Sequence, residues 1–279
     1  MKRMLLATVA LGTTMCSFAQ TDSTKTGTTA TPDTIRVGGM VIVRDGKGEQ
    51  GKNRSISFGG RRHRNVNANF MSTGPILDLG FSNFNDNTNY GSAEAQAFTK
   101  GTGKDDLLRL RNGKSINVNI WAFMHRVSLV KRVVNLKYGL GLELNNYRFD
   151  DERVHFTKNP TIVFADSAYS EVNKNKLAAD YLTVPLMLNF NFTPDRQHPY
   201  GISLGVSAGY LYSSRQKTRV GGKKTKVHDD FELEPWKLSW VGELALGQVH
   251  FYGSYAMKSM WRKGLDVTPY TVGIRLSRW

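Results

Sequence analysis

From Gly74 onward, the chain returns repeatedly to stretches in which apolar residues occupy every second position, with polar or small residues between them. The stretch Tyr181–Phe192, YLTVPLMLNFNF, shows the pattern most clearly, because Leu, Val and Phe there alternate with Tyr, Thr, Pro, Met and Asn. Successive side chains of a β-strand point to opposite faces. The pattern therefore predicts a strand with one apolar face and one face that tolerates water.

Eight segments follow this pattern, and the connections between them differ in length. Short connections lie near Lys131, at 193–199 and near Gly247, whereas long polar segments occupy 82–114, 150–180 and 214–235. Both ends of the repeated region fall on the side of the short connections. Outer-membrane barrels have this asymmetry and an even number of strands. The eight segments are 75–81, 115–124, 134–149, 181–192, 200–212, 237–247, 249–257 and 270–279.

The polar faces decide which solvent the apolar faces meet. An eight-stranded barrel is only wide enough for its own side chains, and small or polar inward residues suit that interior. The apolar face then points to lipid, and closure leaves no unpaired strand edge in the membrane. We therefore predict an all-β fold: an eight-stranded antiparallel transmembrane β-barrel over 74–279, with a bulge expected at Pro185 because proline lacks a ladder donor. Aromatic residues predicted near the membrane interfaces are Tyr138, Tyr200, Tyr210, Tyr212, Trp240 and Tyr270.

The N-terminus reads as an export signal. Residues 1–19 combine a basic start, an apolar run and a small-residue site, which predicts a signal peptide removed before Gln20. Its removal takes away Cys16, the only cysteine, so the exported chain has no disulfide. Residues 20–73 are predicted to be a flexible, basic periplasmic leader with a possible short strand near residues 34–46. The expected location is the outer membrane.

The net charge of the chain indicates which classes of partner it can bind. The formal net charge of +15 becomes +13 when Lys2 and Arg3 leave with the signal. A basic balance favours nucleic acid or an anionic surface, and export excludes nucleic acid as the natural partner. Outer-membrane lipids, including lipopolysaccharide, remain the expected partners, together with a possible envelope protein. A simply solvated basic surface is the alternative.

Several stretches resemble the PorT-like outer-membrane β-barrel family. The matching stretches are LDLGFSNF at 77–84, GKSINVNI at 113–120, YGLGLELNNYRFD at 138–150, KNKLAADYLTVPLML at 174–188, DDFELEPW at 229–236 and the leader segment DTIRVGGMVIV. The resemblance covers most of the chain from Asp33 onward. It implies an eight-stranded barrel in the outer membrane. It implies no particular activity, although a namesake relative is linked to type IX secretion.

A search for catalytic chemistry finds little. The six histidines do not lie at metal-ligand spacings, and no cofactor motif is present. His155 and His228 fall in predicted outer loops close to carboxylates, which is the pairing that acid–base hydrolysis needs. Neither has a nucleophile motif around it. We therefore predict no catalytic residue, no metal and no cofactor.

Two sets of charged residues are the candidate functional sites. The first set faces the predicted lumen and is expected to form an ion-pair network that plugs it, the alternative being a narrow ion path: Lys137, Glu143, Glu243 and Arg275. The second lies in the predicted outer loop 213–230 and is expected to contact lipopolysaccharide: Arg215, Lys217, Arg219, Lys223, Lys224 and Lys226.

These observations favour a non-enzymatic outer-membrane barrel with a plugged lumen, acting in envelope structure or interaction through its loops and leader. A small pore and a lipid-modifying outer-membrane enzyme are the alternatives. Conductance across a planar bilayer separates the pore from the plugged barrel, and altered lipid A separates the enzyme.

Overall fold

The computed structural model describes residues 33–37, 40–44, 57–58, 69–167, 172–196 and 198–276. The chain divides into two compact units, 1–64 and 65–279. In the first unit, β1 (Asp33–Val37), β2 (Met40–Arg44) and β3 (Ser57–Phe58) form an antiparallel sheet. The first two strands lie in the segment where a short strand is predicted. The predicted signal peptide and most of the leader lie outside the described residues.

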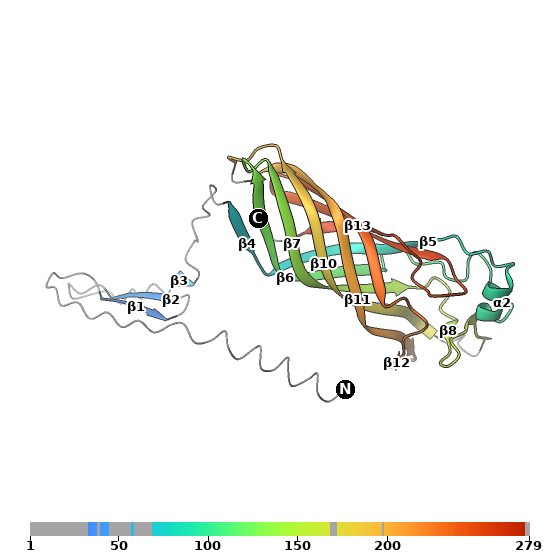
Figure 1. Cartoon of the computed structure of the whole chain (residues 1–279). Coiled ribbons are helices and arrows are strands. Elements are labelled where there is room, and N and C mark those ends of the chain that lie inside the picture. Colours follow the sequence, from blue (N-terminus) through green and yellow to red (C-terminus); the bar gives the residue numbers. More distant parts are fainter. Residues whose placement is uncertain are drawn as a thin grey trace, which may run out of the picture. The chain divides into compact units, whose positions relative to one another are not determined.

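The second unit is a closed barrel of eight antiparallel strands (Figure 1), which confirms the predicted fold class. Each strand pairs with the next along the chain, and the last pairs with the first. The strands are β5 (Ile76–Asp86), β6 (Ile116–Val130), β7 (Val134–Arg148), β10 (Val172–Asn191), β11 (Tyr200–Val220), β13 (Trp236–Leu246), β14 (Val249–Ala256) and β15 (Val267–Arg275).

The two faces of the wall follow the alternation of the sequence. On β10, Leu182 and Leu186 are 44% and 50% exposed, whereas Thr183 and Met187 are 1% and 3% exposed. From Leu182 to Phe190 every exposed residue is apolar, whereas the buried residues include the polar Thr183 and Asn189, which is the reverse of a soluble barrel. The outer face of the barrel is therefore the apolar one.

Pro185 causes no bulge, and this expectation was wrong. The ladder between β10 and β7 runs from Thr183, opposite Gly141, to Leu186, opposite Tyr138, without a change of register. Only the pairings of the two residues between are missing, as expected where proline supplies no N–H. On its other side Pro185 stays in register with Ser207 of β11. The register shifts of the β6–β7 and β10–β11 ladders lie elsewhere, at Trp121/Phe123, Ser128/Val130, Val172/Lys174 and Asp180/Tyr181.

The wall begins earlier than Gly74. The short strand β4 (Phe70–Thr73) pairs with residues 124–127 of β6, and β5 pairs with residues 116–121 of the same strand. Figure 1 places β4 at the barrel end opposite α2, β8 and β12. The short connections 131–133 and 247–248 lie at the β4 end, which is the periplasmic end by the rule that long loops face outward.

The long connections are more ordered than the sequence predicts. Residues 214–220, expected to be loop, continue β11, and β12 (Lys223–His228) turns back to pair with them. The connection 149–171 contains the hairpin of β8 (Val154–Phe156) and β9 (Val163–Ala165). The first connection contains helix α2 (Ala93–Thr99), whose N-terminal amide of Ala95 donates to the Ser92 side chain. No helix in the described ranges is long and apolar enough to cross a membrane.

An apolar core fills the outer end of the barrel, and we call it the outer cap. It joins side chains from all four outer connections with the upper ends of the strands, and every member is at most 6% exposed. The outer loops are thus parts of one packed body. The outer cap consists of Phe98, Leu107, Leu108, Leu110, Tyr147, Phe149, Val154, Phe156, Val163, Leu177, Ala179, Tyr181, Phe231, Leu233, Met260, Trp261, Leu265 and Val267.

Candidate functional site

Arg275 is the centre of a charged network inside the barrel. Its Nε and Nη2 donate to the two carboxylate oxygens of Asp78 at 2.6 and 2.9 Å, and its Nη1 donates to Oε1 of Glu243 at 2.7 Å. Lys137 bonds to the other oxygen of Glu243. The side chains of Arg275 and Asp78 are 2% and 0% exposed. Three of the four predicted lumen charges therefore meet in one network, together with Asp78.

The fourth predicted charge, Glu143, lies nearer the outer end and pairs with Lys237 of β13. The amide of Asn145 also donates to Glu143, at 3.0 Å. Sequence reasoning did not name Asp78 or Lys237. The alternation of the sequence does indicate both residues as inward, because Asp78 lies between Leu77 and Leu79, and Lys237 directly precedes the outward residue Leu238. Both belong to the inward set of their strands.

The six charges of these ion pairs balance. Three carboxylates (Asp78, Glu143 and Glu243) face three cations (Lys137, Lys237 and Arg275) across a few ångströms. Burying a charge is costly unless it is paired and hydrogen-bonded, and each of these has a partner of opposite sign. Amides and hydroxyls surround them. These uncharged lumen residues are Ser82, Asn117, Asn119, Asn135, Asn145, Thr183, Asn189, Ser203, Ser207, Tyr252 and Thr271.

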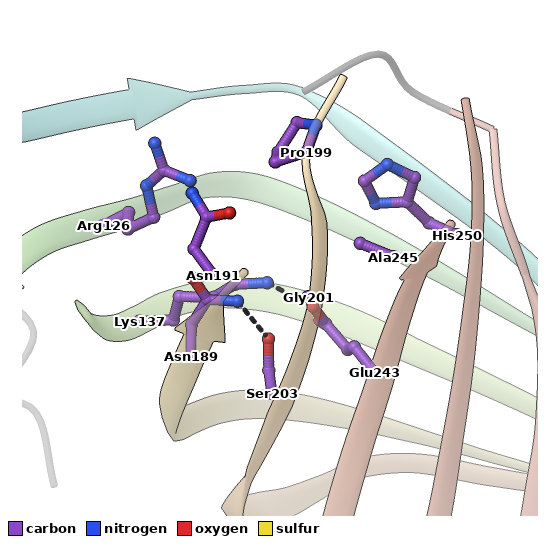
Figure 2. Close-up of a pocket in the computed structure, with 10 residues that line it drawn as sticks. All are labelled: Arg126, Lys137, Asn189, Asn191, Pro199, Gly201, Ser203, Glu243, Ala245 and His250. Carbon is purple, nitrogen blue, oxygen red and sulfur yellow. Dashed lines mark hydrogen bonds and ion pairs between the residues drawn. The ribbon is translucent and has the colours of Figure 1, made fainter. Parts of the chain in front are cut away.

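A small polar recess of about 30 Å³ lies on the periplasmic side of this network (Figure 2). Its inner limit is the Lys137–Glu243 pair, and Asn189 donates to Ser203 at 3.0 Å on its wall. The side chains of Arg126 and His250 lie on opposite sides of it. The recess therefore ends where the ion pairs begin.

The structure places His155 in β8 and His228 at the end of β12. His155 packs edge-on against Phe164, with ring centroids 5.9 Å apart, and burial lowers its pKa while Asp166 acts in the opposite direction. Nearby, hydrogen bonds from Arg153 lower the pKa of Asp151. These contacts are those of a packed hairpin and a surface ion pair. In the described ranges, no three His, Cys, Asp or Glu side chains gather in a way that could hold a metal ion.

The predicted lipopolysaccharide contacts lie on an ordered hairpin. In register, Lys217 of β11 is opposite Lys226 of β12, and Arg219 is opposite Lys224. On the other side of β11, Lys217 is opposite Lys176 and Arg219 is opposite Lys174. Lys223 is opposite Val220, so it belongs to the other face of the hairpin. Five of the six predicted residues thus share one outward face with cations from β10 and β7.

We call this set the basic stripe. Arg148 is opposite Lys176 and extends the stripe onto β7. Arg215 pairs with Asp180 at 2.5 Å, and Arg148 pairs with Glu152 at 3.1 Å. Among the described residues, none of the other members lies within 4.0 Å of a carboxylate. The basic stripe consists of Arg148, Lys174, Lys176, Arg215, Lys217, Arg219, Lys224 and Lys226.

Aromatic side chains mark the membrane border below the basic stripe. Tyr210 and Tyr212 precede Arg215 on the same strand and are 47% and 49% exposed. The ring of Trp236 on β13 packs edge-on against Tyr210, with centroids 5.1 Å apart. Exposed Trp and Tyr side chains favour the headgroup level of a membrane. The cations therefore begin directly outside the apolar band of the wall.

Comparison with known proteins agrees with this architecture. A family model described as outer membrane protein beta-barrel domain matches residues 77–257. No curated protein matches the chain. Similar solved structures include Neisserial surface protein A, at 12% identity over 75% of this chain and 99% of that one with a TM-score of 0.32. Another is Ail, the attachment invasion locus protein of Yersinia pestis, at 10% identity over 74% and 97% with a TM-score of 0.28.

The narrower resemblance to PorT-like barrels is not tested by these matches and stays a prediction. The family model, by contrast, spans more than half of the chain and covers seven of the eight strands. The chain belongs to the outer-membrane protein β-barrel family, and its location is the outer membrane.

Proposed function

We propose that this protein is a non-enzymatic outer-membrane barrel, closed to solutes, which supports the envelope by binding the anionic glycolipid of the outer leaflet. The observation that carries the proposal is the basic stripe above the aromatic border. Lipopolysaccharide presents phosphates at this level, and each Lys or Arg near an anionic membrane surface contributes on the order of 1 kcal/mol. A possible envelope protein partner of the leader remains a prediction from the sequence.

The position of the stripe supports a lipid ligand over a soluble one. Its members point outward from the barrel wall, alternating with inward residues such as Gln216, which is 2% exposed. Like charges opposite one another on paired strands repel, as at Lys176 and Lys217. An anion bound between them relieves that repulsion. Phosphates fixed in the surrounding leaflet are the anions nearest to this face.

The closed lumen is the second part of the proposal. It is supported by the six charges that pair across the interior and by the polar recess, which ends at Lys137 and Glu243. A pore would need a continuous path through these pairs and through the outer cap. Eight-stranded barrels are generally filled by their own side chains.

Glycolipid binding is tested by neutralising part of the stripe. We expect Lys176→Gln, Lys217→Gln, Arg219→Gln and Lys226→Gln together to weaken binding to lipopolysaccharide about 10- to 100-fold at low salt, since exposed contacts are individually weak but add up. The difference should shrink as salt rises, because the Debye length falls to about 8 Å at physiological ionic strength. Binding to immobilised lipopolysaccharide across a salt titration measures this effect.

The matched control removes four cations elsewhere on the outer end: Lys104→Gln, Lys114→Gln, Lys258→Gln and Arg262→Gln. These residues are exposed. The control and the stripe variant each lose four positive charges, so their net charges are equal. If the control weakens binding as much as the stripe variant, net charge and not the stripe binds the glycolipid. Unchanged binding in the stripe variant leaves these cations as a solvated surface.

Closure of the lumen is tested by conductance. We expect the purified barrel in a planar bilayer to give no steady single-channel current, because the ion pairs and the outer cap lie across the interior. Steady, uniform current steps from the wild type would refute the plugged lumen and favour the small pore. Unaltered lipid A in cells that overproduce the protein is the expected result for a non-enzymatic barrel.

A further inference from the structure

The lipid-facing wall has a bare patch where two glycines are opposite each other. Gly242 of β13 and Gly253 of β14 are cross-strand partners, and both belong to the outward set of their strands. Leu204 flanks the pair on β11 and Val272 flanks it on β15, at 54% and 55% exposed. The wall forms a wide, shallow recess of about 620 Å³ here, which we call the glycine recess.

Packing within the chain does not require these glycines. A Cβ added to Gly242 would lie 3.5 Å from Cδ2 of Leu204, and one added to Gly253 would lie 3.5 Å from the Thr271 carbonyl oxygen. Both are ordinary contact distances. By contrast, a Cβ on Gly205 would lie 2.1 Å from the Leu186 carbonyl oxygen. Neither Gly242 nor Gly253 has a positive φ. The recess is therefore a surface feature with room for another molecule.

The polarity of the glycine recess changes from its floor to its outer rim. The floor is the glycine pair between two aliphatic side chains. On the outer side, the next row of paired outward residues is Trp240, Tyr255 and Tyr270. Asn85, near the outer end of β5, also lines the recess. An apolar floor below amphipathic rings and an amide matches a lipid, whose chain lies in the membrane and whose ester region lies at the interface.

We propose that the glycine recess binds an acyl chain of lipopolysaccharide, with the Tyr255 and Tyr270 hydroxyls and the Asn85 amide facing the lipid's ester and amide groups. This inference takes its ligand from the proposed function but uses a different site. A second copy of the chain is the alternative occupant, and the cross-linking described below distinguishes it.

Filling the recess tests the proposal. Gly242→Leu with Gly253→Leu covers the floor, and the open space and ordinary φ angles allow the barrel to fold. In neutral nanodiscs we expect this variant to bind intact lipopolysaccharide about 10-fold more weakly than the wild type. Binding of the deacylated headgroup should not change. Ala122→Leu, on the outer face of β6, is the matched control and should bind both ligands as the wild type does.

Comparing intact with deacylated lipopolysaccharide distinguishes acyl-chain binding in the glycine recess from headgroup binding by the basic stripe. The stripe variant should lose affinity for the intact and the deacylated molecule alike, whereas the filled recess should lose it only for the intact one. Equal affinity of the filled variant and the wild type for intact lipopolysaccharide overturns the recess site, and so does chemical cross-linking that traps a second copy there. Tyr255→Phe with Tyr270→Phe keeps the rings and should reduce affinity severalfold, which tests the rim independently of the floor.

Discussion

A barrel carrying arginine in place of Leu186 is expected to be about 2–4 kcal/mol less stable in lipid vesicles than the natural protein. Leu186 is 50% exposed on the apolar face, midway between the aromatic border at the outer end and the periplasmic turn after β10. A guanidinium at this depth has no water and no partner of opposite charge. Urea titration of the vesicle-inserted protein measures the free energy of unfolding, and the inserted fraction reports assembly.

Two control variants distinguish the effect of placing a charge in lipid from a general disturbance of packing. Leu186→Met keeps an apolar side chain and should cost less than about 1.5 kcal/mol. Asn189→Arg points into the periplasmic recess beside Ser203, where water and polar groups are available, and should disturb packing without placing charge in lipid. If Leu186→Arg folds and inserts as well as Leu186→Met, the assignment of faces on β10 is wrong.

Removing the central cation of the lumen should have an effect of similar or larger size. We expect Arg275→Met to lower the free energy of unfolding by about 3–5 kcal/mol, because truncating one partner of a buried ion pair leaves its charge uncompensated. Asp78 is the residue that loses most, since its two oxygens accept from Arg275 and its remaining neighbouring donor is Trp121 at 2.6 Å. Glu243 retains Lys137.

The double variant Arg275→Met with Asp78→Asn should recover part of the loss, because it removes the stranded carboxylate. Arg132→Met is the surface control: its partner Asp195 is 82% exposed, so the change should cost less than about 1 kcal/mol. A loss at Arg275 no larger than at Arg132 would mean that the lumen charges are hydrated and do not plug the barrel. Additive effects at Arg275 and Asp78 would mean that the two are not coupled.

Alternation of side chains was enough to predict the wall. A strand that spans a membrane must expose one apolar face along its length, so Tyr181–Phe192 carries its orientation in its own residues. The same rule gave the inward position of Lys137 and Glu243. It applied equally to Asp78 and Lys237, and applying it to every strand would have found the whole set of charges.

The outer end was harder to predict because its residues find their partners far along the chain. Ser214–Val220 is polar enough to look like loop, yet it forms strand because β12 pairs with it on one side and β10 on the other. The helix at Ala93–Thr99 and the hairpin at Val154–Ala165 are too short to be stable alone. They form against the outer cap. The grouping of Lys174 and Lys176 with Lys217 likewise depends on register, which alternation does not specify.

The outer cap makes the order of the outer loops depend on closure of the whole barrel. Phe98, Phe156, Phe231 and Trp261 come from four separate connections, so no single hairpin holds enough of this core to bury it. Pairing of the strands brings the ends of these long segments together and so offsets the entropic cost of closing them. A barrel with one strand out of place would therefore present loose, apolar loops to external proteases. Resistance of the outer surface to digestion is a measure, readable from outside the cell, of whether all eight strands have closed.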